Sequence, residues 1–315
     1  MGRSLLYIER NVLSYVSRYA SVHAKQTPAE YCFELVRLFL SSLYNETYKL
    51  KHDYENFLCS LLLQQNARQS AFAIRAFNIE VAQVQDQVHD RNIGKMRLQF
   101  WTDALNNAYK GTPQRSPVIL ELHRILQKHS LSKHYFKRLI DVRLERLCGS
   151  PFYDISTIEK YAEYSTSSIY YLLLEAHGIK NINADHAASH MGKAQGIITL
   201  IRSIPYNARN RVNMLPEDIL MKYGVSTEAV FQGQPSKDFQ NVIYDVASYG
   251  KLHLDAAISL KSKVEKNVGL IFLPIVCLER YLKKLRRVDF NIFDTRLQTR
   301  DNLLPLHLYW KKLIS

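Results

Sequence analysis

Residues 192–216 read GKAQGIITLIRSIPYNARNRVNMLP, and this stretch decides the fold. Its apolar residues recur at intervals of three and four, which predicts a helix over residues 186–204. The polar run 206–213 then predicts a break before Leu215 and Pro216. A long helix ending in a polar turn is therefore the first element that the sequence establishes.

The same helical periodicity extends outward through most of the chain. Phe77, Val81, Val84 and Val88 follow one another at helical intervals, and strand-like alternation is hard to find. Further helices are expected over residues 72–88, 96–109, 117–129, 133–147, 155–177, 216–223, 238–266 and 269–285. The 315 residues include only 11 glycines and 9 prolines, and no break resembles a domain linker. We therefore expect one all-α domain over residues 31–315.

The charge of the chain is strongly basic, with 42 Lys and Arg against 29 Asp and Glu. Residues 123–146 are rich in Lys and Arg, but these alternate with apolar residues at helical spacing. No zinc-finger, RNP or GXXG motif accompanies them, so we interpret them as a helix surface and expect no nucleic-acid partner. The four cysteines are scattered without a CxxC pair, which is typical of buried thiols in a reducing compartment.

The first 30 residues have the character of a targeting segment. Residues 1–25 carry three arginines and one lysine but only one acid, Glu9, and in a helix the arginines fall opposite the apolar residues. This pattern is typical of a mitochondrial presequence, and an amphipathic helix docked on the body is the alternative. Residues 38–50 join an apolar end to a polar centre, and we expect a short helix or an inserted loop there.

No apolar stretch is long enough to cross a bilayer, since the longest, residues 268–278, is interrupted by Pro274. The basic run 283–287 follows it. This run could meet anionic lipid or an acidic partner, or it could be a solvated helix face.

Motifs of the commonest enzyme classes are absent, including GxSxG, GxxxxGK[ST] and GxGxxG. His186 and His190 could share a helix face, as a pair of metal ligands would. A third ligand is not evident, however, and Asn183 or Asp185 fits equally well as a helix N-cap. We predict no metal site and no cofactor.

Two stretches resemble the squalene/phytoene synthase family, namely residues 70–86 and 192–216. The second matches without a gap, and Gly192, Ala194 and Arg202 stand where the family has the same residue types. The resemblance implies the all-α isoprenoid-synthase fold with a central cavity. It also implies a reaction in which two facing clusters of carboxylates hold Mg²⁺ ions that ionise a prenyl diphosphate.

Most of those carboxylates are missing from this chain. The family's metal positions correspond here to Ala82, Gln83, Asp86, Ser203 and Asn207, and only Asp86 is acidic. Neutral oxygens cannot balance the charge of several divalent ions, so we assign no catalytic residue. Glu80, a nearby acid, lies about 200° around the helix from Ala82 and is expected to point away.

A further departure concerns the helix that lines the prenyl channel in the family, which corresponds to residues 161–170. Ser167 and Tyr170 occupy glycine positions there, so Tyr170 is expected either to narrow the channel or to turn into a helix-packing seam. The candidate contacts for any polar ligand that enters the cavity are Asp86, Tyr170, Arg202, Ser203 and Asn207.

Other strings resemble a non-enzymatic branch of the family that assists assembly of mitochondrial respiratory complex I. They include MRLQFW at residues 96–101, DHAASH at 185–190 and RVDFNIF at 287–293. The resemblance implies an early-acting factor on the matrix side, peripherally attached to the inner membrane. Its partners would be complex I subunits or intermediates, including a membrane-embedded, mitochondrially encoded subunit. A residual prenyltransferase and an isoprenoid or lipid carrier are the alternatives.

Overall fold

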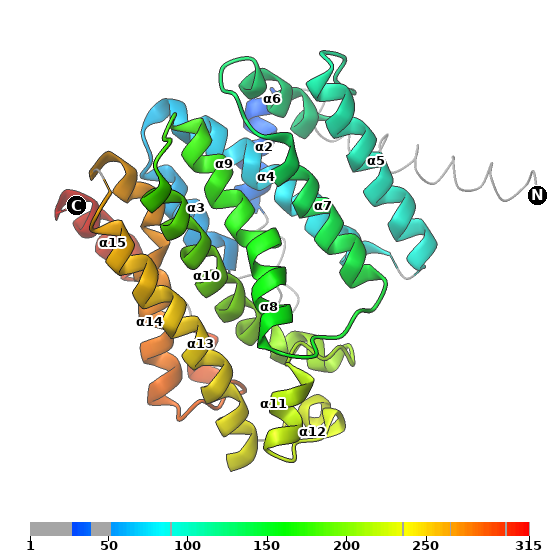
Figure 1. The fold of residues 1–315 in the computed structure, drawn as a ribbon, viewed down its shortest axis with the longest axis vertical. Coiled ribbons are helices and arrows are strands. Elements are labelled where there is room, and N and C mark those ends of the chain that lie inside the picture. Colours follow the sequence, from blue (N-terminus) through cyan, green and yellow to red (C-terminus); the bar gives the residue numbers. More distant parts are fainter. Residues whose placement is uncertain are drawn as a thin grey trace, which may run out of the picture.

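The computed structural model describes residues 27–38, 52–88, 90–234, 236–264, 266–299 and 301–314. In these ranges the chain forms helices joined by short connections, without a strand (Figure 1). The helices of the first half are α2 (Pro28–Leu38), α3 (His52–Leu61), α4 (Gln65–Gln87), α5 (Arg91–Tyr109), α6 (Pro117–Leu126) and α7 (Lys133–Leu147).

The second half continues in the same way. Its longer elements are α8 (Ile155–Ala162), α9 (Ser168–Ala176), α10 (Ile182–Arg209), α13 (Lys237–Lys261), α14 (Pro274–Arg287) and α15 (Leu304–Ile314). Its shorter elements are α11 (Glu217–Lys222), α12 (Thr227–Gln232), the π-helical turn η1 (Glu163–Ser167), and the 3-10 turns η2 (Lys266–Phe272) and η3 (Thr295–Leu297).

Helix α10 occupies the centre of the second half and packs against α8, η1, α9 and α13. Two glycines allow this close packing. A Cβ atom added at Gly192 would lie 2.3 Å from the Cα atom of Ser167, and one added at Gly196 would lie 2.4 Å from the Cβ atom of Ala162. The backbone of α10 therefore rests directly on the end of α8 and on η1, an approach that side chains at these positions would prevent.

One large hydrophobic core connects the two halves. It contains buried residues from α2, α4, α5, α6, α7, α9, α10, α13 and α14, including Phe77, Phe136 and Tyr170. A second, smaller cluster joins α3, α14 and α15 and consists of Cys59, Leu273, Cys277, Leu304 and Leu308. The expectation of an all-α chain built around one core agrees with this arrangement.

Some predicted boundaries were wrong. Residues 155–177 were expected to form one helix, but η1 divides them into α8 and α9. A break was expected over residues 206–213, yet α10 continues through Pro205 to Arg209. The helix expected over 269–285 begins only at Pro274, because proline suits the first turn of a helix, where its missing N–H is not needed.

Parts of the chain named in the domain prediction lie outside the described residues. Residues 1–26 of the predicted presequence and residues 39–51, next to Leu38, are among them. Helix α2 begins at Pro28 and packs against α4 and α6. Within the part that the structure describes, no helix combines the length and apolar composition needed to span a bilayer.

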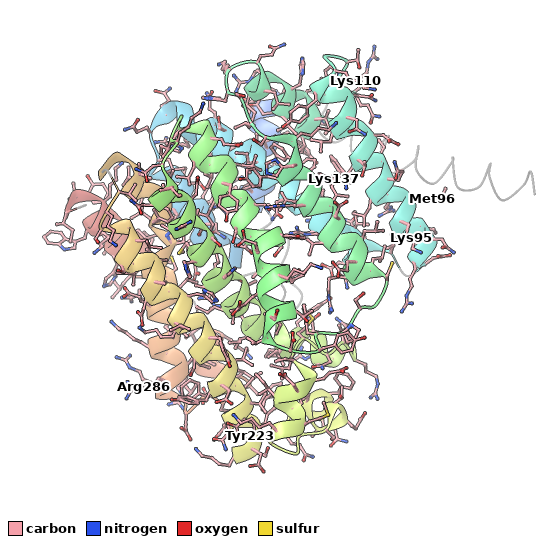
Figure 2. The ribbon with its side chains drawn as sticks, viewed as in Figure 1. Lys95, Met96, Lys110, Lys137, Tyr223 and Arg286 are labelled. Atoms are coloured by element: carbon pink, nitrogen blue, oxygen red, sulfur yellow. The ribbon has the colours of Figure 1, made fainter. Side chains whose placement is uncertain are left out.

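Basic side chains are spread over the surface rather than gathered on one face. Lys95, Lys110 and Lys137 are exposed on α5, at its end and on α7, whereas Arg286 is exposed on α14 at another side of the molecule (Figure 2). Lys137 thus lies on the helix surface, as expected, but the expectation was wrong for Arg143 of the same helix, which is buried and donates to Oδ1 of Asn78 (2.6 Å).

Candidate functional site

The family's first metal cluster corresponds to the last turns of α4. Asp86 is exposed there, and Ala82 and Gln83 are half-buried. The Gln83 side-chain oxygen accepts a hydrogen bond from Nε2 of Gln87 (3.0 Å), so this amide is engaged on its own helix. The acid at the third position is therefore flanked by neutral groups.

Glu80 lies on the other side of α4, in agreement with the helical spacing. It is buried, and its Oε1 atom accepts a hydrogen bond from the Tyr31 hydroxyl of α2 (3.1 Å). Burial raises the pKa of Glu80 to about 7, and the Tyr31 hydrogen bond offsets only part of that effect. Glu80 is thus a core carboxyl beneath α2 and does not join Asp86.

The second metal cluster corresponds to the last two turns of α10. The Ser203 hydroxyl donates to the carbonyl oxygen of Leu200 (2.7 Å), and Nδ2 of Asn207 donates to the carbonyl oxygen of Ser203 (3.0 Å). Both side chains therefore bond to the backbone of their own helix. Such local hydrogen bonds are common for short polar side chains within helices.

Arg202 is buried and held on two sides. Its Nη1 atom forms an ion pair with Oε2 of Glu55 in α3 (2.8 Å), and its guanidinium lies 4.0 Å from the centroid of the Tyr281 ring in α14. Burial acts to lower the pKa of Arg202, but Glu55 and Tyr281 outweigh it and the pKa is raised. For Tyr281, burial is the main cause of a pKa raised to about 12. The arginine is a fixed cation inside the bundle.

Tyr170 is also part of the interior. Its hydroxyl donates to Oε1 of Gln195 (2.5 Å), and Nε2 of Gln195 donates to Oδ1 of Asn56 (3.0 Å). The ring stacks on Phe272, with centroids 6.2 Å apart. Burial raises the pKa of Tyr170. Tyr170 of α9 thus contacts α10 through Gln195 and η2 through Phe272.

Helix α3 supplies the polar partners that the sequence analysis missed. Besides Glu55 and Asn56 it carries Ser60, whose hydroxyl accepts from Nε of Arg75 in α4 (3.0 Å) and donates to the Asn56 carbonyl (2.7 Å). The interior polar network consists of Glu55, Asn56, Ser60, Arg75, Tyr170, Gln195 and Arg202. Only Tyr170 and Arg202 were identified from sequence, because nothing in the apolar periodicity reveals which polar residues of α3 face inward.

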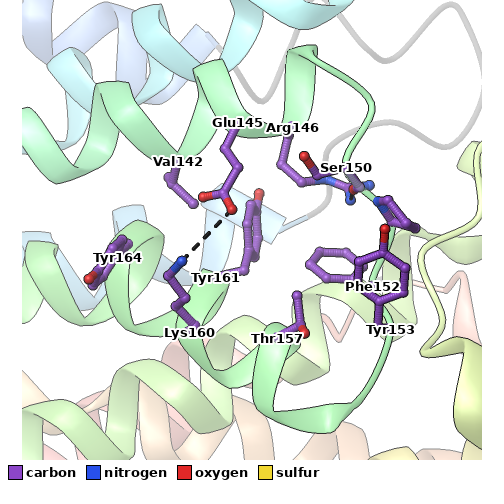
Figure 3. A pocket seen from close by; sticks show the side chains of 11 residues that line it. Val142, Glu145, Arg146, Ser150, Phe152, Tyr153, Thr157, Lys160, Tyr161 and Tyr164 are labelled. Carbon is purple, nitrogen blue, oxygen red and sulfur yellow. Dashed lines mark hydrogen bonds and ion pairs between the residues drawn. The ribbon is translucent and has the colours of Figure 1, made fainter.

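A pocket of about 280 Å³ lies elsewhere, between α7 and the start of α8 (Figure 3). Lys160 and Glu145 form an ion pair in it (3.8 Å), and the Arg146 guanidinium lies 4.1 Å from the centroid of the Phe152 ring. Asp86, Tyr170, Arg202, Ser203 and Asn207 do not line this pocket. The central cavity implied by the family resemblance stays a prediction.

The two histidines considered as metal ligands, one turn apart on α10, differ in their surroundings. His186 is exposed, whereas Nδ1 of His190 lies 2.9 Å from Nδ1 of His253 in α13. Nε2 of His253 in turn lies 3.0 Å from Oε1 of Glu159 in α8. Burial, followed by the neighbouring His253, lowers the pKa of His190. Among the described residues, no three or more His, Cys, Asp and Glu side chains are grouped so that they could hold a metal ion.

Comparison with known proteins identifies the family. The model of the squalene/phytoene synthase family matches residues 50–302. The chain belongs to the squalene/phytoene synthase family. Its all-α isoprenoid-synthase-like fold is shared with a dehydrosqualene synthase crystallised in complex with ligand, at a TM-score of 0.73 and 14% identity. That match covers 91% of this chain and 98% of the other. The predictions of family and fold are therefore confirmed.

Within the squalene/phytoene synthase family, the chain is similar to proteins that are named as assembly factors and not as synthases. It is 44% identical to NADH dehydrogenase (ubiquinone) complex I, assembly factor 6, of Homo sapiens, across 90% of this chain and 82% of the relative. It is 42% identical to the homolog from Drosophila melanogaster, across 84% and 81% of the two chains. The resemblance to the assembly-factor branch is confirmed by these relatives.

Proposed function

We propose that this member of the squalene/phytoene synthase family is a non-enzymatic assembly factor for mitochondrial respiratory complex I. It acts at an early stage, on the matrix side of the inner membrane, and binds complex I subunits or intermediates. The names of the relatives at 44% and 42% identity support a role in the assembly of complex I. The neutral residues at the family's metal positions are the observation that carries the non-enzymatic role.

The physical argument concerns charge. Several Mg²⁺ ions around a diphosphate need carboxylates to hold them, and carboxylate oxygens are the ligands that Mg²⁺ favours. Asp86 is the only acid at the five family positions, while Ser203 and Asn207 bond to their own helix. A site of this composition would bind the cations too weakly to ionise a prenyl diphosphate.

The interior also supports a binding role for the scaffold. Tyr170 stands where the family has a glycine, and its buried ring and hydroxyl are fixed by Phe272 and Gln195. Arg202 is neutralised by Glu55 rather than left to meet an anion. These contacts stabilise the inherited fold, and we infer that the outer surface of the bundle carries the function.

Rescue of complex I in cells that lack the protein tests the proposal. The double variant Asp86→Ala, Asn207→Ala is expected to restore complex I activity to the level of the unchanged chain, since it removes only the remains of the metal site. Complexes II to V should persist in the deficient cells. A double variant that accumulates normally but leaves complex I inactive would contradict the non-enzymatic role.

Purified protein tests the enzymatic alternative directly. We expect no Mg²⁺-dependent release of pyrophosphate from farnesyl or geranylgeranyl diphosphate, with a catalytically active family member as the positive control. Sustained turnover that is lost in Asp86→Ala would establish a residual prenyltransferase instead.

A further inference from the structure

Helix α15 is attached to the body by one narrow edge. Leu304 and Leu308 are buried in the second cluster, against Cys59, Leu273 and Cys277. At about 3.6 residues per turn, the remaining apolar side chains fall on the opposite side of the helix. They are exposed, and they comprise Leu306, Tyr309, Trp310, Leu313 and Ile314, with Leu303 just before the helix. Figure 1 shows α15 at the edge of the molecule beside α14.

The apolar composition of this outward face is unusual for a protein surface in contact with water. Leu306 is 66% exposed and Trp310 is 65% exposed, and both belong to one continuous stripe along the helix. Contiguous exposed apolar residues of this kind mark a surface that another body covers. The stripe is the ridge of a single helix, which the apolar interior of a bilayer can cover without a matching groove.

The charges of α15 are exclusively positive. The sequence LPLHLYWKKLI contains Lys311 and Lys312 in its last turn and no acid. Lys261 at the end of α13 lies close enough that Lys311 contributes, after burial, to lowering its pKa. The connection that precedes α15 is bonded to the basic end of α14, since Nζ of Lys284 donates to the Thr299 carbonyl (3.4 Å). On the same helical spacing Lys311 and Lys312 flank the buried edge of α15 and not the stripe, so they would lie at the level of the headgroups when the stripe is inserted, where they favour an anionic surface.

We infer that α15 is the membrane-contacting helix of this protein and lies flat in the headgroup region of an anionic phospholipid bilayer. Leu306, Trp310 and Leu313 would face the acyl chains, and the lysines would remain among the headgroups. A surface helix with Trp, Tyr and Leu on one side and Lys as its charge has the composition of interfacial helices. The inference rests on the proposed function only for placing the protein beside a membrane.

Fluorescence of the full chain provides the first test. The sequence contains two tryptophans, of which Trp101 is buried and Trp310 is exposed. Vesicles of phosphatidylcholine mixed with phosphatidylglycerol should shift the emission to shorter wavelength, and lipids brominated on the acyl chains should quench it. Trp310→Phe should abolish both responses. No shift on adding vesicles would overturn the inference, and so would a Trp310 contribution, taken as the difference between the unchanged chain and Trp310→Phe, that is already blue-shifted in buffer.

Sedimentation with the same vesicles provides the second test, with a matched pair of variants. Leu306→Glu should weaken partitioning at least about tenfold, because it replaces an inserted apolar side chain by a charge. Leu252→Glu in α13 is the control, since Leu252 is 65% exposed, and it should bind like the unchanged chain. Equal loss in both variants would contradict the assignment to α15.

Two further measurements test the contribution of the lysines to vesicle binding and distinguish a membrane from a protein partner. Lys311→Gln, Lys312→Gln should weaken binding to anionic vesicles about fivefold or more and leave binding to pure phosphatidylcholine unchanged. If Leu306→Glu loses complex I rescue although the unchanged chain ignores vesicles, α15 binds a protein and the lipid assignment is wrong. If vesicles bind but the unchanged chain fails to rescue, the proposed function fails while the membrane helix stands.

Discussion

Among the glycines that the structure describes, Gly192 leaves the least room for an added methyl group. An alanine Cβ there would lie 2.1 Å from Oγ and 2.3 Å from Cα of Ser167, so the backbones of α10 and η1 would have to separate. We expect Gly192→Ala to lower the free energy of unfolding by about 3 kcal/mol, measured by urea denaturation, because overpacking of a rigid contact forces backbone shifts.

Gly250 in α13 is the control for that substitution. A Cβ atom there would meet only side-chain atoms of Ile197 and Ile198, at 3.3 Å and 3.4 Å. Gly250→Ala should change the free energy of unfolding by less than about 1 kcal/mol, since the gain in helix propensity offsets the tighter contact. Equal stability of the two variants would show that α10 and η1 are not in such close contact.

Glu80 predicts a pH dependence of stability. Its pKa rises from 4.5 to about 7 on folding, so its contribution to stability is full below pH 4.5 and is lost as the pH rises through about 7. Glu80→Gln keeps an acceptor for the Tyr31 hydroxyl and cannot ionise. Relative to the unchanged chain, the free energy of unfolding of the variant should be higher by on the order of 2–3 kcal/mol at pH 8 and equal at pH 4.5.

Urea titrations at both pH values measure that difference. A constant offset between the two proteins across the range would mean that Glu80 does not change its pKa on folding.

Helix α3 makes several polar contacts with neighbouring helices. The Glu55 carboxylate balances the buried Arg202 of α10, with an N–O distance of 2.8 Å. Glu55→Ala should therefore lower the free energy of unfolding by about 3 kcal/mol, because removing one partner leaves the other charge buried. Glu55→Gln retains a hydrogen-bond acceptor and should lose less.

The exposed pair Arg211–Glu228 is the matched control, since both side chains are more than half exposed. Glu228→Ala should leave the urea midpoint unchanged within experimental error, because water screens such pairs. A Glu55→Ala protein with the same midpoint as Glu228→Ala would mean that Arg202 is not held by Glu55.

The elements also show where sequence periodicity stops being informative. Residues 155–177 keep helical spacing throughout, and the π-helical turn η1 adds no sequence signal of its own. Ser167, its last residue, lies against Gly192 of α10, and the Ser167 hydroxyl donates to the Ser189 carbonyl (3.0 Å). This contact joins segments about 25 residues apart in the chain, and apolar periodicity does not contain such contacts.

At the scale of the whole molecule, protection against hydrogen exchange should follow the two cores. Helix α10 lies in the main core, whereas among the described residues the buried ones of α15 are Leu304 and Leu308, in the second cluster. We expect amides of α10 to exchange only on global unfolding and those of α15 to exchange through local opening several orders of magnitude faster. Mass spectrometry of exchanged peptides measures this, and equal protection of both helices would contradict it.

The sequence was sufficient for the fold class, the family and most long helices, because these depend on apolar spacing and on motifs such as residues 192–216. For the candidate site, the sequence predicted only which residues of the family's metal site are missing. Which carboxylates are missing is visible in the sequence, whereas the pairing of Arg202 with Glu55 and of Tyr170 with Gln195 depends on how α3 enters the bundle. Helix α15 was missed entirely, since its apolar residues surround the helix and show no single buried face.

The thiols beneath α15 make its detachment measurable. Cys59 and Cys277 are buried in the cluster that Leu304 and Leu308 cover, while Cys148 is exposed. A hydrogen bond with Cys59 and then burial raise the pKa of Cys277, so this thiol is unreactive while covered. A maleimide should label Cys148 at once and the covered pair only when α15 lifts away. If vesicles draw the helix off the body, that labelling rate would increase on their addition.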